Sequence, residues 1–69
     1  MAQPIRSRPG RDVVKLLKGQ GVRQTDVARS AGCSLYSVNA VIHRAYGVSD
    51  AMRERVWQEI ERALNGAAA

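Results

Sequence analysis

Residues 34–43 bring together hydrogen-bonding and aromatic side chains, and none of the ten residues is acidic. Val38 and Val41 lie three residues apart, which is the spacing of neighbours on one face of a helix. The side chains off this face are small, polar or aromatic, namely Ser34, Leu35, Tyr36, Ser37, Asn39, Ala40 and His43. A solvated helix face usually carries Glu and Lys instead. This composition predicts a helix face that enters a DNA groove, because its side chains fit between two phosphate walls and can contact base edges.

Six of these side chains form the predicted base-contacting set: Ser34, Leu35, Tyr36, Asn39, Ala40 and His43. Two members of the set keep a second interpretation. His43 could contact a base or a phosphate, or only favour the negative end of the helix dipole. Tyr36 could place its ring or hydroxyl on the sugar-phosphate backbone, or be a surface residue that contacts nothing.

Phosphate contacts are predicted on both sides of this stretch. Arg23 and Gln24 stand at the expected start of the preceding helix, where backbone N–H groups attract anions. The predicted phosphate-contacting set is Arg11, Arg23, Gln24, Thr25, Ser37 and Arg44. Residues 1–9 contain two prolines and little apolar surface, so we expect a flexible basic arm there. Its Arg6 and Arg8 either contact the DNA backbone or minor groove, or belong to a merely solvated terminus.

Two short helices have to position these side chains, and they are predicted over residues 24–31 and 35–44. The short turn between them forces a steep crossing, so that their apolar faces can meet. The first helix presents Val27, Ala28 and Ala31 on one face, and the second presents Val38 and Val41.

The ends of these helices carry recognisable local signals. Gly32 is expected to end the first helix with a positive φ, which only glycine adopts at little cost. Ser34 is expected to cap the second helix through its hydroxyl. The first helix lacks the usual Ser or Thr cap, since Arg23 occupies that position. Gln24 or Thr25 could therefore shift the cap by one residue.

Two further helices, over residues 11–18 and 49–64, complete an all-α, four-helix domain over residues 10–65. The first is expected to cover the open side of the helix-turn-helix with Val13, Leu16 and Leu17. The last is expected to be capped by Ser49 and to bury Met52, Val56, Ile60, Ala63 and Leu64. Residues 66–69 are expected to form a frayed tail.

Two single residues, Trp57 and Cys33, allow two interpretations each. Trp57 lies beside the apolar stripe of the last helix, so it either completes the core or forms a dimer contact. Trp57 and Leu64 are accordingly the candidate dimer residues. Cys33 occupies a small apolar position in the turn, where a buried structural thiol is favoured over a redox sensor.

Composition narrows the possible functions. The 69 residues suffice for one small domain, and the formal charge of +5 favours a polyanionic partner. The charge is uneven: residues 1–23 carry six Lys and Arg against one Asp, whereas residues 49–69 carry three Arg against four acidic residues. One Cys and one His suggest neither a disulfide nor zinc, and we expect no metal or other cofactor.

Other classes of protein are disfavoured by what the sequence lacks. No paired carboxylates or glycine-rich phosphate loop accompany the single His and Cys, so catalytic residues are not expected and an enzyme is improbable. No apolar run approaches the roughly 20 residues of a membrane span, and no signal peptide is recognisable. We therefore expect a cytoplasmic protein without a membrane partner.

Two segments resemble the DNA-binding domain of lac-repressor-type regulators. Residues 25–34, Thr-Asp-Val-Ala-Arg-Ser-Ala-Gly-Cys-Ser, match the Asp-Val-Ala and Ala-Gly-Val-Ser pattern that opens their helix-turn-helix. Residues 48–56, Val-Ser-Asp-Ala-Met-Arg-Glu-Arg-Val, match the start of their third helix. The resemblance covers about residues 24–62. Two features depart from the lac type: an extra helix is expected at 11–18, and no hinge helix or sugar-binding domain is expected after Leu64. In these features the sequence resembles compact lambda-repressor-like and Ner-like phage regulators.

The resemblance implies roles for four residues. Gln24 matches a glutamine that often braces the DNA at the start of the first motif helix. Leu35, Tyr36 and Ala40 match base-contacting positions of lac-type proteins. Since Leu35 and Ala40 cannot form side-chain hydrogen bonds, their contacts would be apolar, for example with a thymine methyl group.

The favoured hypothesis is a sequence-specific regulator of transcription that binds double-stranded DNA. It is expected to be a repressor that binds a palindromic operator as a homodimer, through the major groove. One alternative is an adaptor or antirepressor that binds a second regulatory protein through the face around Trp57. Another is a transposition or DNA-architecture factor that bends DNA.

Overall fold

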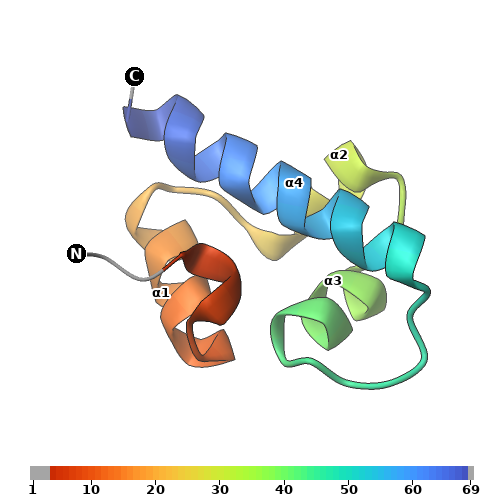
Figure 1. The fold of residues 1–69 in the computed structure, drawn as a ribbon. Helices are drawn as coiled ribbons and strands as arrows, with labels where there is room; N and C mark the ends of the chain where they lie inside the picture. Colours follow the sequence, from red (N-terminus) through yellow and green to blue (C-terminus); the bar gives the residue numbers. More distant parts are fainter. Residues whose placement is uncertain (1–3, 69) are drawn as a thin grey trace.

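The computed structural model describes residues 4–68, and the side chains of residues 4–65. A single 3-10 turn, η1 (Ile5–Ser7), precedes four α-helices: α1 (Gly10–Gly19), α2 (Gln24–Ala31), α3 (Leu35–Ile42) and α4 (Asp50–Ala68). The described residues contain no strand, so the predicted all-α fold is confirmed. Figure 1 shows α4, the longest helix, running across the top of the view above α1 and α3.

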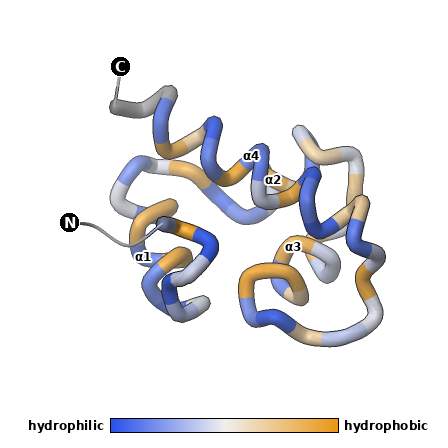
Figure 2. Tube along the Cα trace, viewed as in Figure 1, coloured by the Kyte–Doolittle hydropathy of each residue, from blue (hydrophilic) through white to orange (hydrophobic). Residues whose placement is uncertain are grey.

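One hydrophobic core holds all four helices together. Its members are Val13, Leu17, Val27, Ala28, Ala31, Val38, Val41, Ile42, Val56, Trp57 and Ile60. Figure 2 shows the corresponding pattern, in which hydrophobic segments recur along α1, α3 and α4. The stripes predicted from helical periodicity thus meet in one place, because α4 contacts each of the other three helices.

Three helices end in the same backbone motif, in which a left-handed residue and the residue after it both donate their N–H groups to carbonyls of the last turn. Gly21 ends α1 in this way with φ +72°, and Gly32 ends α2 with φ +71°. At the end of α3 the same position is occupied by Arg44, with φ +58°. There the Ala45 N–H donates to the Ala40 carbonyl at 2.8 Å.

The cap predictions are confirmed at both serines. The Ser34 hydroxyl accepts from the Ser37 N–H at 3.2 Å, and the Ser49 hydroxyl accepts from the Met52 N–H at 3.1 Å. Arg23 is itself the residue before α2, so the cap does not shift to Gln24 or Thr25. The Asp26 carboxylate accepts from the Arg23 N–H at 3.1 Å, which satisfies one of the free donors of the first turn.

The helix ends differ from prediction at two places. α3 ends at Ile42, two residues early, because Arg44 adopts the left-handed conformation. α4 continues four residues beyond Leu64, through Gly66 to Ala68, where a frayed tail was predicted. Ala67 and Ala68 have the highest helix propensity, which favours continuation of the helix although the glycine costs about 1 kcal/mol. Ala69 lies outside the described residues.

The N-terminal segment also differs from prediction. Residues 4–9 fold against the helices rather than forming a flexible arm: Ile5 packs on the core, and Arg6 pairs with two carboxylates of α4. Residues 1–3 of the predicted arm lie outside the described residues. Within residues 4–68, no helix is both long and apolar enough to cross a bilayer.

Candidate nucleic-acid interface

One face of α3 is exposed to solvent and carries polar, aromatic and apolar side chains. Leu35 is 48% exposed and Tyr36 is 73% exposed, and Asn39 on the next turn is also exposed. Val38 and Val41 on the opposite side are fully buried, as their spacing predicts. Burial of one face fixes the rotation of the helix, so its polar and aromatic face points to solvent.

Ala40 corrects the predicted base-contacting set. Its side chain is only 4% exposed, so it cannot contact a base. Ala40 lies about 100° further around the helix than Asn39, which turns its methyl group toward the body of the protein. A side chain this small is covered by the surrounding backbone, which the resemblance to base-contacting positions did not indicate.

Leu35, Tyr36 and Asn39 form one wall of an open groove of about 980 Å³. The other wall comes from α1 and from the segment that joins α1 to α2. The full lining is Val14, Leu17, Lys18, Gly21, Val22, Arg23, Gln24, Thr25, Leu35, Tyr36 and Asn39. Two cations and no carboxylate line the groove, so its surface is electropositive and suited to an anionic ligand.

The groove contains three of the predicted phosphate-contacting residues, Arg23, Gln24 and Thr25. Asp26 already accepts from the Arg23 N–H, so the groups left to bind an anion there are the Arg23 side chain and the N–H groups of Gln24 and Thr25. Lys18 also lines the groove and was missed as a phosphate contact. No pattern within α1 identifies it, because its position at the groove depends on how α1 lies against α3.

Ser34 and Ser37 lie outside the groove lining and are joined to each other at the start of α3. Their hydroxyl oxygens are 3.2 Å apart, and the Ser34 hydroxyl also accepts from the Ser37 N–H. Their first role is therefore to cap the helix. Arg11 is exposed one helical turn before Val14 and likewise does not line the groove.

His43 packs against the start of α1 rather than joining the groove. A Cβ atom added at Gly10 would come within 2.5 Å of the His43 Nδ1 atom. Glycine at position 10 thus allows the imidazole to approach the backbone closely. His43 is exposed to solvent, but the structure does not place it among the residues that line the groove.

Arg44, predicted to contact phosphate, joins distant parts of the chain through its guanidinium. Its guanidinium donates to the carbonyls of Arg6 and Arg8, the latter at 2.8 Å, and to the carbonyl of Ile42 at 3.3 Å. It also lies over the Trp57 ring, 5.8 Å from the ring centroid. These bonds use three of the five N–H donors of the guanidinium, and Arg44 is exposed, so its phosphate contact stays a prediction.

Arg6 is likewise held by protein partners. It pairs with Glu54 and with Glu61, the latter at 2.8 Å. The hydrogen bonds to these two carboxylates, Glu54 first, raise the pKa of Arg6 and so favour its charged form. The Arg6 guanidinium is therefore not displayed as a DNA-contacting arm residue would be. The Arg8 carbonyl lies in the same assembly, as an acceptor for Arg44.

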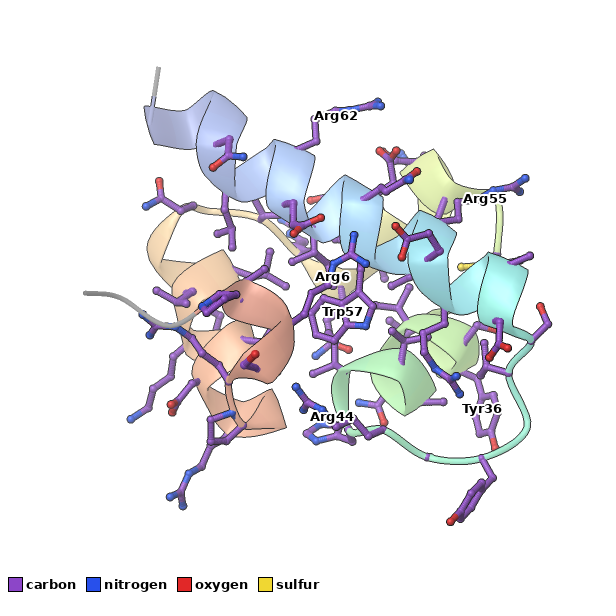
Figure 3. The ribbon with its side chains drawn as sticks, viewed as in Figure 1. Arg6, Tyr36, Arg44, Arg55, Trp57 and Arg62 are labelled. Carbon is purple, nitrogen blue, oxygen red and sulfur yellow. The ribbon has the colours of Figure 1, made fainter. Side chains whose placement is uncertain are left out.

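Trp57 belongs to the core, which resolves its two interpretations. Only 5% of it is exposed, so it cannot form the predicted dimer contact or an adaptor surface. Leu64, the other candidate, is half-buried and packs against the core. Figure 3 shows Arg6 and Trp57 close together in the centre of the view, whereas Tyr36 stands apart near the loop between α3 and α4.

Charge is segregated in the fold. Four of the six acidic residues belong to α4, and two of these hold Arg6. Residues 10–42, which contain α1, α2 and α3, include only Asp12 and Asp26. The groove therefore lies on the helices that carry the excess of positive charge.

Cys33 is half-buried beside α4, as expected of a structural thiol. Burial raises the pKa of its thiol, while the nearby charge of Arg55 lowers it in part. Arg55 also donates to the Ala31 carbonyl at 3.4 Å, which connects α4 to the end of α2. Within the described residues, His, Cys, Asp and Glu side chains do not gather in groups of three that could hold a metal ion.

Comparison with protein-family models, with curated proteins and with solved structures gives no match to this chain. The function of the groove therefore has to be inferred from its own geometry and charge.

Proposed function

We propose that this protein binds double-stranded DNA sequence-specifically and regulates transcription, most simply as a repressor. The observation that carries the proposal is the uncovered side of α3, where Leu35, Tyr36 and Asn39 border a groove lined by two cations and no carboxylate. The major groove of DNA admits an α-helix, and its walls are phosphates that Lys18 and Arg23 would neutralise. The resemblance of residues 25–34 to lac-type regulators supports the same interpretation.

In this proposal, different side chains contact the bases and the phosphates. Tyr36 and Asn39 contact base edges and provide specificity, whereas Lys18, Arg23, Gln24 and Thr25 contact phosphates and position the helix. Arg11 extends the phosphate contacts along α1. The bacterial or phage-infected cytoplasm is the proposed location, because the DNA is accessible there.

Two copies are proposed to occupy a palindromic site, with their α3 helices about 34 Å apart on successive major grooves. The exposed large apolar side chains of the described residues are Leu35, Tyr36 and Tyr46, and none belongs to α4. The described side chains of α4, up to residue 65, thus offer no large exposed apolar surface, and we propose that the copies pair on the DNA rather than in solution. An adaptor function through Trp57 has lost its basis, because this side chain is buried.

The proposal is tested by selecting duplexes from a random double-stranded library with the full chain. Dissociation constants are then measured by fluorescence anisotropy for the selected duplex and a scrambled one, at several salt concentrations. Asn39→Ala and Tyr36→Ala should weaken binding to the selected duplex by about tenfold, in the range of one lost base contact. Binding to the scrambled duplex should change little.

Lys18→Ala and Arg23→Ala should weaken binding to both duplexes, and each should reduce the salt slope by about one. Arg62→Ala is the matched control, because it removes a positive charge from the far part of α4, where Arg62 pairs with Glu59. It should leave the salt slope nearly unchanged. Failure to enrich any sequence, or unchanged specificity in both Asn39→Ala and Tyr36→Ala, would overturn the proposal.

A further inference from the structure

Leu35 is a large apolar side chain held half in solvent at the first position of α3. It is not a member of the buried core, although Val38 and Ile42 of the same helix are. A single exposed leucine is ordinary on a protein surface. Leu35 is not isolated, however, because Val14, Leu17 and Val22 also line the groove that it borders. The groove next to Leu35 is therefore partly lined by apolar side chains, and a further apolar group can pack there.

Asn39 lies one helical turn after Leu35 and borders the same groove. It carries the only amide side chain in α3. Among the described residues its side-chain amide has no hydrogen-bond partner. The His43 N–H bonds to the backbone carbonyl of Asn39, not to its side chain. An exposed asparagine amide presents one donor and one acceptor side by side, the pattern that pairs with the N7 and N6 atoms of adenine in the major groove.

We propose that these two side chains specify a thymine and a nearby adenine in each half-site. Leu35 contacts the C5 methyl group of the thymine, and Asn39 pairs with the adenine. The inference rests on the proposed binding of DNA and names the bases recognised by that surface. One helical turn advances about 5.4 Å, whereas base pairs are about 3.4 Å apart, so the two bases lie one or two steps from each other.

The choice of thymine follows from what Leu35 lacks. The other bases present hydrogen-bonding atoms and no methyl group on their major-groove edges, and a leucine can satisfy none of these atoms. The thymine methyl is the only apolar group there, and burying it against Leu35 removes apolar surface from water. By the same reasoning, 5-methylcytosine would provide the contact equally well, because its methyl group occupies the same ring position.

The test uses the full chain and the duplex selected from the random library. Each thymine of the half-site is replaced singly by deoxyuridine, which removes only the methyl group. One position should lose about fourfold in affinity, the value of one buried methyl group. Placing cytosine at that position should weaken binding as well, and 5-methylcytosine there should recover most of the methyl-dependent part.

Variants assign the effect to Leu35. Leu35→Ala should abolish the deoxyuridine effect at that one position, whereas Leu35→Met, which keeps a long apolar side chain, should retain it. Tyr46→Ala is the control, because Tyr46 is exposed in the loop after α3 and does not line the groove. Asn39→Ala should abolish the loss caused by 7-deazaadenine at the neighbouring adenine. Helicity by circular dichroism shows that each variant is folded.

The outcomes separate the two proposals. If no duplex is selected, the proposed DNA binding itself fails. If a duplex is selected but its half-site lacks thymine, or Leu35→Ala keeps the full deoxyuridine effect, DNA binding stands and the base assignment is overturned.

Discussion

Arg44 lies over the ring of Trp57, with its guanidinium carbon 5.8 Å from the ring centroid. The same guanidinium donates to the carbonyls of Arg6 and Arg8, so one side chain joins α4, the end of α3 and the N-terminal segment. Arg44 does this from a left-handed backbone position that ends α3. The segment before α1 is thereby made part of the folded domain.

Arg44→Ala should lower the free energy of unfolding by about 1 kcal/mol, from the lost cation–π contact and hydrogen bonds. The left-handed backbone conformation costs alanine about as much as arginine, so the change in the free energy of unfolding reports the loss of the side-chain contacts. Urea denaturation measures the loss. Trypsin should also cut the Arg6–Ser7 bond faster, because the carbonyls of Arg6 and Arg8 lose their hydrogen bonds to Arg44. Arg29→Ala, at an exposed position on α2, should stay within about 0.5 kcal/mol of the parent; equal losses in the two variants would contradict the role of Arg44.

Acidification should release the N-terminal segment through Glu54. The hydrogen bond from Arg6 is the main reason that the pKa of Glu54 is lowered from its ordinary value of 4.5. A carboxylate whose pKa is lower in the folded state adds stability above its ordinary pKa, and that stability is lost as the pH falls through the folded value. The thermal midpoint of the parent should therefore fall more steeply below about pH 4.5 than that of Glu54→Gln. Parallel curves for the two proteins between pH 3 and pH 6 would rule this out.

Ser34 should tolerate substitutions that keep the helix cap. Ser34→Ala should cost about 1 kcal/mol and Ser34→Gly only a few tenths, because the hydroxyl satisfies the Ser37 N–H. Ser34→Asp preserves the cap and should keep the stability of the parent. If α3 enters DNA, the added carboxylate should nonetheless weaken DNA binding by repelling phosphates. Urea denaturation and anisotropy on the same preparations separate the two effects, and intact DNA binding in Ser34→Asp would place Ser34 away from the phosphates.

Two glycines should respond to alanine in opposite directions. Gly32 has φ +71°, and a Cβ there meets open space, so Gly32→Ala should cost about 1–2 kcal/mol through backbone strain alone. Gly19 is the last residue of α1, with similar open space around it, so Gly19→Ala should stabilise the fold by about 0.5–1 kcal/mol. Thermal denaturation of both variants tests this, and destabilisation by Gly19→Ala would show that α1 ends earlier than described.

The candidate interface was predictable where its determinants are local. Tyr36 and Asn39 were predicted to be exposed because Val38 and Val41 define the buried side of a regular helix. Ala40 was misplaced, since a residue at the edge of that side can be either covered or open according to how closely the neighbouring backbone approaches. Lys18 was missed because the groove requires α1 to lie next to α3, which periodicity within one helix does not specify.

The sequence alone determined the four helices and the turn between α2 and α3. The Ser34 hydroxyl, the Gly32 backbone and the spacing of the apolar residues act over a few residues, so they give the same result in any tertiary setting. Only the tertiary structure decided the positions of Arg6, Arg44 and Trp57. Arg6 bonds to Glu61, 55 residues away, and Arg44 bonds to the carbonyl of Arg8, 36 residues away. Such partners are selected by how the helices pack, which no local pattern encodes.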